Sequence, residues 1–194
     1  MTTQYFFLAV AISLAVIGNI PYLYKMYKGE VRPHPYTWFI WSIVSLVTFF
    51  GQVQKGAGLG AIPTGASEVF TIIIFLFSLK NGFKGIEKRD NYFLAAALLG
   101  LIPWALTSDP TLSVITVVSV DVIAFIPTLQ KTWRHPESET YILYSTNVLR
   151  HILTLYLTAR WNVATTLHSF AMIITNTLMT TFIFRSGLKK YAKK

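Results

Sequence analysis

Apolar residues along the chain gather into runs of about 20, separated by short segments rich in charged residues, proline and glycine. A run of that length is enough to cross the hydrocarbon core of a membrane as a helix. The pattern predicts seven membrane-spanning helices, over residues 5–24, 36–54, 58–80, 91–108, 111–131, 141–159 and 162–184. No basic segment precedes the first run and no small-residue cleavage site follows it, so we interpret it as a retained span and not as a signal peptide.

Composition supports a membrane protein. Of the 194 residues, 53% are hydrophobic and only 13% are charged, with a mean hydropathy of +0.50. This is too apolar for a soluble domain of the same length. The formal net charge of +9 does not point to nucleic acid, because the basic residues follow loops and not one face. The chain has no cysteine, so disulfides and thiolate metal sites are excluded.

The loops differ sharply in lysine and arginine. Cytoplasmic loops of membrane proteins carry an excess of these residues. Alternate loops place 14 of the 17 on one side: Lys25, Lys28, Arg32, Lys80, Lys84, Lys88, Arg89, Lys131, Arg134, Arg185, Lys189, Lys190, Lys193 and Lys194. We therefore expect an N-terminus outside and a C-terminus in the cytoplasm. A bacterial inner membrane fits this pattern first, with an organelle membrane as the alternative.

An internal repeat relates the two halves of the chain. The segment IPYLYKMYK, residues 20–28, returns 106 positions later as IPTLQKTWR, residues 126–134, without a gap. The ends of the repeats also agree, since IFLFSLK at 74–80 resembles TFIFRSG at 181–187. A repeat of this kind indicates two copies of one structural unit.

The charge pattern places both copies in the same orientation. A copy of three helices ends on the opposite side of the membrane from where it began. The second copy must begin on the same side as the first, so one extra helix must lie between them. The span 91–108 supplies it. We expect two parallel three-helix bundles joined by a linker helix, with residues 1–80 as the first bundle, 81–109 as the charged loop and linker helix, and 110–194 as the second bundle and basic tail.

A proline lies near the predicted cytoplasmic end of helices one and five, and a loop with basic and aromatic residues follows each of them. Together with the arrangement of three, one and three helices, this resembles the SWEET and PQ-loop (MtN3-like) transporter superfamily. The chain looks like a divergent member of prokaryotic type. The PQ dipeptide of that superfamily reads Pro21-Tyr22 in the first copy and Pro127-Thr128 in the second. The resemblance implies alternating access between two bundles, with Pro21 and Pro127 as hinges. Prolines inside helices remove one amide donor and so bend the helix.

Three ionisable residues fall near the middle of predicted spans: Glu68, Asp121 and Arg150. Each is expected to disfavour insertion by about 2.5 to 3.5 kcal/mol at the bilayer centre, so each should face the interior of the bundle. We expect Asp121 to pair with Arg150, and Glu68 to remain a protonatable group beside the pathway. The alternative is a purely structural ion pair with a permanently protonated Glu68. We interpret His151, next to Arg150, as a structural residue.

Uncharged polar residues add candidate solute contacts: Asn147 in the sixth span, Asn176 in the seventh, Asn19 one turn before the first proline, and His168 in the outer half of the seventh span. Sugar-carrying relatives use one asparagine from each of helices three and seven. Asn176 matches the second of these, whereas residues 58–80 contain no asparagine, so Glu68, Ser67 or Thr71 would have to supply the other solute contact.

Aromatic residues divide by their depth. Trp38, Trp133 and Trp161 fall near predicted interfaces, as expected of an aromatic belt. Trp41 lies one turn further in and could line the pathway as a stacking surface, although packing against lipid or core is the more common role.

These features predict a transporter of a small polar solute. A sugar is the first candidate; the alternatives are a proton-coupled carrier of amino acids or vitamin precursors, or a sorting receptor on the same fold. No pairing of a nucleophile with a base can be assembled, so we do not expect an enzyme. No cofactor or metal is expected. The expected partners are the solute and the bilayer, with association into a homo-oligomer left open.

Overall fold

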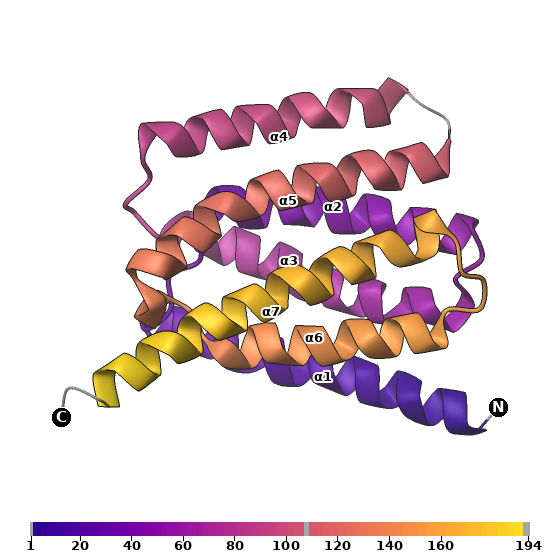
Figure 1. Ribbon diagram of the computed structural model, residues 1–194, viewed down its shortest axis with the longest axis horizontal. Helices are drawn as coiled ribbons and strands as arrows, with labels where there is room; N and C mark the ends of the chain where they lie inside the picture. Colours follow the sequence, from indigo (N-terminus) through magenta and orange to yellow (C-terminus); the bar gives the residue numbers. More distant parts are fainter. Residues whose placement is uncertain (1, 107–108, 192–194) are drawn as a thin grey trace.

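The computed structural model describes residues 2–106 and 109–191 of the chain, which form seven α-helices and two short 3₁₀ segments (Figure 1). In chain order these are α1 (Thr2–Tyr27), α2 (Pro35–Gln54), η1 (Gly58–Ala61), α3 (Ile62–Asn81), α4 (Lys88–Leu106), α5 (Pro110–Arg134), η2 (Pro136–Ser138), α6 (Tyr141–Leu157) and α7 (Val163–Tyr191). The described residues contain no β-strand. The prediction of an all-α protein with seven helices is confirmed.

Helix boundaries agree with the predicted spans to within a few residues, except that α7 continues to Tyr191. The end of the fourth predicted span, at residues 107 and 108, lies outside the described residues. Within the described residues, five helical stretches are long and apolar enough to cross a membrane: α1, α2, η1 with α3, α5, and α7. Of the other two, α6 has 17 residues and α4 opens with three consecutive charged residues.

The distribution of side chains is the reverse of that in a water-soluble protein. Large apolar residues lie on the outside of the helices, such as Val69, Phe50 and Ile174, which are 58%, 58% and 62% exposed. Charged and polar residues lie inside, including Asp121 and Arg150. An apolar exterior around a polar interior suits a surface in contact with lipid, where polar groups must find partners inside the protein.

Six helices close into a ring, and the seventh lies outside it. Around the ring, contacts follow the order α1, α3, α2, α5, α7, α6 and back to α1. Helix α4 packs along α5, with a smaller contact to α2, at the edge of the molecule (Figure 1).

The two ends of the ring differ in their number of lysine and arginine residues. We call the basic end the one formed by residues 28–34, 82–87 and 135–140 and by the helix ends that adjoin these segments, together with the C-terminal end of α7. The opposite end holds the start of α1, residues 55–61 and residues 158–162. The two chain termini lie at opposite ends (Figure 1).

Both repeat-matched prolines lie inside helices, Pro21 in α1 and Pro127 in α5. The hydroxyl of Thr37 in α2 donates to the carbonyl of Ala124, 2.8 Å away, and accepts from the hydroxyl of Thr128 at 2.9 Å. These bonds support the α5 backbone beside Pro127 from a neighbouring helix. In the first copy Gly18 lies directly against Thr146 of α6, with no room for a β-carbon.

Candidate functional site

A buried cavity lies at the centre of the ring, lined by side chains from all six helices. Its free volume is about 50 Å³, enough for roughly four water molecules. The lining residues are Asn19, Trp38, Trp41, Ser45, Ser67, Thr71, Asp121, Leu143, Tyr144, Asn147, Arg150, His151, His168, Met172 and Asn176. The cavity thus collects polar residues that are far apart in the sequence.

Most of the residues singled out in the sequence meet in this cavity. Asn19, Trp41, Asn147, His168 and Asn176 all contribute to its lining, as do both Asp121 and Arg150. Glu68 is buried in α3 but is not among the lining residues. The prediction that these polar groups face the interior follows from the cost of exposing them to lipid.

Arg150 has only neutral partners. Its Nε donates to Asn147 Oδ1 at 3.1 Å, and its Nη1 to the carbonyl of Pro63 at 3.3 Å. Its Nη2 lies 2.8 Å from His151 Nε2. The ion pair that we expected between Arg150 and Asp121 is not formed. The guanidinium is 4% exposed, so its charge lies inside the protein without a carboxylate beside it.

Asp121 has His168 as its neighbour, with 3.7 Å between Oδ2 and Nε2. Neither carboxylate oxygen makes a hydrogen bond of good geometry within the described residues, although the indole N–H of Trp41 lies close by and the side chain is 1% exposed. The His168 ring lies 5.4 Å from the ring of His151, edge to face, and His151 Nδ1 lies 3.3 Å from Ser169 Oγ. Histidines therefore stand between the acid and the arginine, which is why these two groups do not meet. His151, expected to be structural, also lines the cavity.

Glu68 is the second buried acid without a partner. It is 3% exposed and neither of its oxygens makes a hydrogen bond of good geometry, although the hydroxyl of Ser45 lies close by. The protonation and role of Glu68 stay predictions.

Two asparagines are held by their own helices. The side-chain amide of Asn19 donates to the Ala15 carbonyl and that of Asn176 to the Met172 carbonyl, both at 2.8 Å. Each thus uses its Nδ2 on the preceding turn and keeps its carbonyl oxygen for other partners.

Trp41 and Trp38 form an aromatic wall. Trp41 stacks on Phe125 with 5.5 Å between ring centroids, and meets Trp38 edge to face at 5.1 Å. Neither indole N–H makes a hydrogen bond of good geometry within the described residues, although that of Trp41 lies close to Asp121 and that of Trp38 close to the Tyr22 hydroxyl. The aromatic-belt prediction is wrong for Trp38, which is 3% exposed, because neighbouring rings such as Tyr22 cover it. Trp133 and Trp161 are exposed, as predicted.

No family model, no curated protein and no solved structure matches the chain. What the site can do is therefore argued from its residues. Within the described residues no group of three or more histidine, aspartate or glutamate side chains could hold a metal ion.

A buried network around Glu139 closes the basic end. Its carboxylate accepts hydrogen bonds from the hydroxyls of Tyr22, at 2.9 Å, and Tyr144, at 3.0 Å. Lys131 forms an ion pair with the same carboxylate and also donates to the backbone carbonyl of Arg32 at 2.6 Å. The network joins α1, α5, α6 and two loops. Sequence analysis missed it, because Tyr22 and Glu139 are 117 residues apart; the only signal was that Tyr22 replaces the glutamine of the PQ dipeptide.

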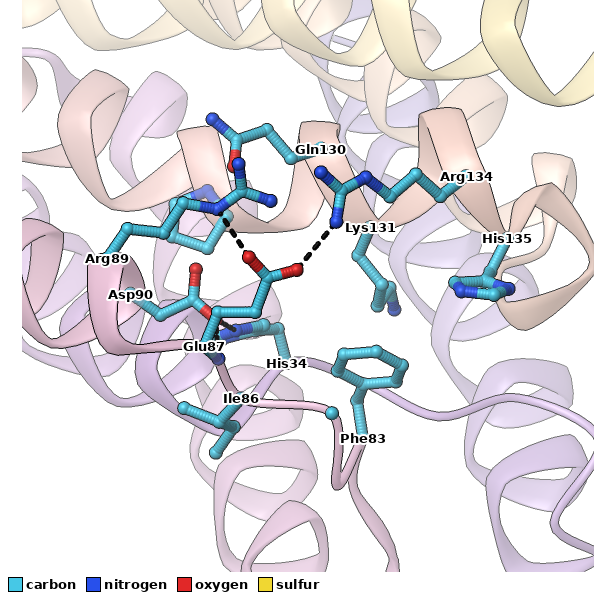
Figure 2. A pocket seen from close by; sticks show the side chains of 12 residues that line it. His34, Phe83, Ile86, Glu87, Arg89, Asp90, Gln130, Lys131, Arg134 and His135 are labelled. Atoms are coloured by element: carbon cyan, nitrogen blue, oxygen red, sulfur yellow. Dashed lines mark hydrogen bonds and ion pairs between the residues drawn. The ribbon is translucent and has the colours of Figure 1, made fainter.

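A second, larger pocket of about 380 Å³ lies beside this network, between α5 and the segment that leads into α4 (Figure 2). Glu87 reaches both Arg89, at 3.0 Å, and Arg134, at 2.6 Å. His34 Nε2 lies 3.4 Å from Asp90 Oδ2. Burial lowers the pKa of His34, and the attraction of Asp90 opposes this effect only in part. His34 is therefore neutral at pH 7.

At the opposite end two loops are joined by backbone contacts. The Ala159 N–H donates to the Ala57 carbonyl at 3.0 Å, and Asn162 Nδ2 to the Lys55 carbonyl at 3.4 Å. Gly60 packs so closely on Thr158 that a β-carbon would lie 2.9 Å from its Cα. Segments 55–61 and 158–162 therefore cover this end of the ring.

Proposed function

We propose that the chain is a membrane carrier that moves a small polar solute through the central cavity by alternating access between two three-helix bundles, α1 to α3 and α5 to α7, with α4 as the linker helix. The observation that carries this proposal is the buried polar cavity itself. It is lined by side chains from six helices whose outer surfaces are apolar, and contacts between the two proposed bundles lie toward both ends of the ring.

The helix contacts support the division into two bundles. Exchanging α1, α2 and α3 for α5, α6 and α7 leaves the order around the ring unchanged, as a two-fold axis along the ring would require. Within each proposed bundle the third helix packs between the other two. Contacts of α1 with α6 and of α2 with α5 then form the boundaries between the bundles.

The contacts at both ends join one proposed bundle to the other. At the basic end Tyr22 of the first bundle reaches Glu139 of the second. At the opposite end Ala57 of the first bundle accepts a hydrogen bond from Ala159 of the second. A rocking motion of the bundles about Pro21 and Pro127 would break one set of contacts while keeping the other.

The excess of lysine and arginine assigns the basic end to the cytoplasm and the start of α1 to the outside. A bacterial inner membrane is the proposed location.

Transport is tested with the purified protein reconstituted into liposomes. Net uptake of radiolabelled sugars, amino acids and organic cations is measured, with protein-free liposomes as the control. Saturable uptake of at least one solute supports a carrier. A solute that binds to the purified protein but is not taken up would favour a receptor on the same fold.

A further inference from the structure

We propose that the solute is a small zwitterion, whose carboxylate binds Arg150 and whose ammonium group binds Asp121. This inference rests on the proposed carrier function and adds to it the chemical class of the solute. It is argued from an acidic and a basic side chain that both line the cavity and that have no partner of opposite sign in hydrogen-bond contact within the described residues.

Arg150 supplies the anion-binding half. A guanidinium has five N–H donors, of which the described contacts use three, all to neutral acceptors. A buried charge without a counter-charge is strongly unfavourable, so such groups are paired in most proteins. A carboxylate is the group that matches the planar fork of an arginine with two parallel hydrogen bonds. A carboxylate bound in the cavity would supply the missing charge.

Asp121 supplies the cation-binding half. It lies on α5 and lines the same cavity as Arg150 on α6, and neither of its oxygens makes a hydrogen bond of good geometry, although the Trp41 indole N–H lies close by. Its neighbour His168 lies 3.7 Å away, too far for a good hydrogen bond. An ammonium group brings three donors and a positive charge, which are what these two oxygens lack.

Size favours a small molecule. The free volume of about 50 Å³ accepts roughly four waters, close to the number of non-hydrogen atoms in the smallest amino acids. A hexose has about twice as many non-hydrogen atoms as alanine and would bring no group of opposite charge to either side chain. The sugar that the family resemblance suggests first is therefore a poorer match for this cavity than an amino acid such as alanine.

Three related compounds test the two halves of the site separately. Alanine carries both charged groups. Propionate is alanine without the amine, and ethylamine is alanine without the carboxylate. We expect alanine to bind the purified protein and to be exchanged by liposomes containing it. Propionate and ethylamine should each bind about 30-fold or more weakly, since each leaves one buried charge unpaired. Glucose serves as the neutral comparison.

Variants locate each half. The affinity of the Arg150→Gln variant for alanine should fall to the affinity of the wild-type protein for ethylamine. The affinity of the Asp121→Asn variant for alanine should fall to the wild-type affinity for propionate. Arg150→Lys keeps the charge but loses the fork, and should retain part of the affinity. Arg185→Gln is the matched control, because Arg185 is an exposed arginine near the C-terminal end of α7, outside the cavity lining and both sets of closing contacts, and it should leave binding unchanged.

The outcomes distinguish this inference from the carrier function. If the wild-type protein transports glucose and not alanine, or binds propionate or ethylamine as tightly as alanine, the zwitterion is ruled out while the carrier stands. If no solute of any class crosses the membrane, the carrier function itself fails. These comparisons use wild-type protein, so they hold even if the Arg150 variants do not fold.

Discussion

Replacing Tyr22 by phenylalanine should open the basic end of the protein. The Tyr22 hydroxyl donates to Glu139 at 2.9 Å and links α1 to the loop before α6. The substitution removes this hydroxyl and keeps the ring, which is fully buried against Trp38. The Glu139 carboxylate keeps Tyr144 and Lys131 as partners, so the network is weakened and not abolished.

The size of the effect follows from the charge of the acceptor. A hydrogen bond to a charged group contributes about 1.5 to 3 kcal/mol net. If the bond is broken when the basic end opens, losing it raises the population of the open state by about 10- to 150-fold, since 1.4 kcal/mol corresponds to a factor of ten. The change is large enough to measure as a rate of access to the cavity.

Access can be measured by cysteine labelling, because the natural chain has no cysteine. Ser67 lines the cavity from α3, and Ser67→Cys introduces a thiol of similar size there. In liposomes of known orientation, a membrane-impermeant maleimide added on the side of the basic end should label this thiol about 10- to 150-fold faster in the Tyr22→Phe background.

Tyr24→Phe is the matched control, since Tyr24 lies on the same helix, is 57% exposed and makes no hydrogen bond through its hydroxyl among the described contacts. It should leave labelling unchanged. Equal labelling rates in the Tyr22→Phe protein and this control would refute the role of the network in closing the basic end. So would faster labelling from the opposite side alone.

Three further substitutions test other parts of the structure. Gly60→Ala places a β-carbon 2.9 Å from the Thr158 Cα and should weaken closure of the opposite end by about 1 to 3 kcal/mol. The Ser67→Cys thiol should then be labelled faster by maleimide added on that side. An unchanged labelling rate would contradict this. Burial lowers the pKa of His34 in the folded protein, so His34 takes up a proton at a higher pH in the unfolded chain, and the folded state loses stability as the pH drops below about 6.5. His34→Gln should therefore lose less melting temperature than the wild type between pH 7.5 and 5.5. An identical loss in the two proteins would contradict this. Pro127→Ala restores a backbone donor inside α5 and should slow solute exchange while leaving equilibrium binding nearly unchanged; a parallel loss of binding would instead indicate a structural role.

The helices could be predicted from the sequence because the thickness of a membrane fixes the length of an apolar run. The α5 run, for example, was expected at 111–131 and the helix spans Pro110–Arg134. The same physics predicted which polar residues turn inward, since lipid offers no partner to Asp121, Arg150 or Asn176. All three line the cavity.

The partners of these residues could not be predicted. Which groups meet depends on the rotation and depth of each helix relative to its neighbours, and a shift of one residue turns a side chain by about 100°. Asp121 consequently faces His168 and not Arg150. The closure at Glu139 was also out of reach, because a loop residue gives no periodic signal and its partners come from helices far away in the chain.

The central claim is that the solute crosses only if the opposite end opens. The double variant Ala57→Cys/Ala159→Cys tests it directly, because a backbone hydrogen bond of 3.0 Å joins these two residues and no other cysteine can react. In proteoliposomes, oxidation should abolish solute exchange and reduction should restore it. Full exchange by the oxidised, cross-linked protein would contradict the account.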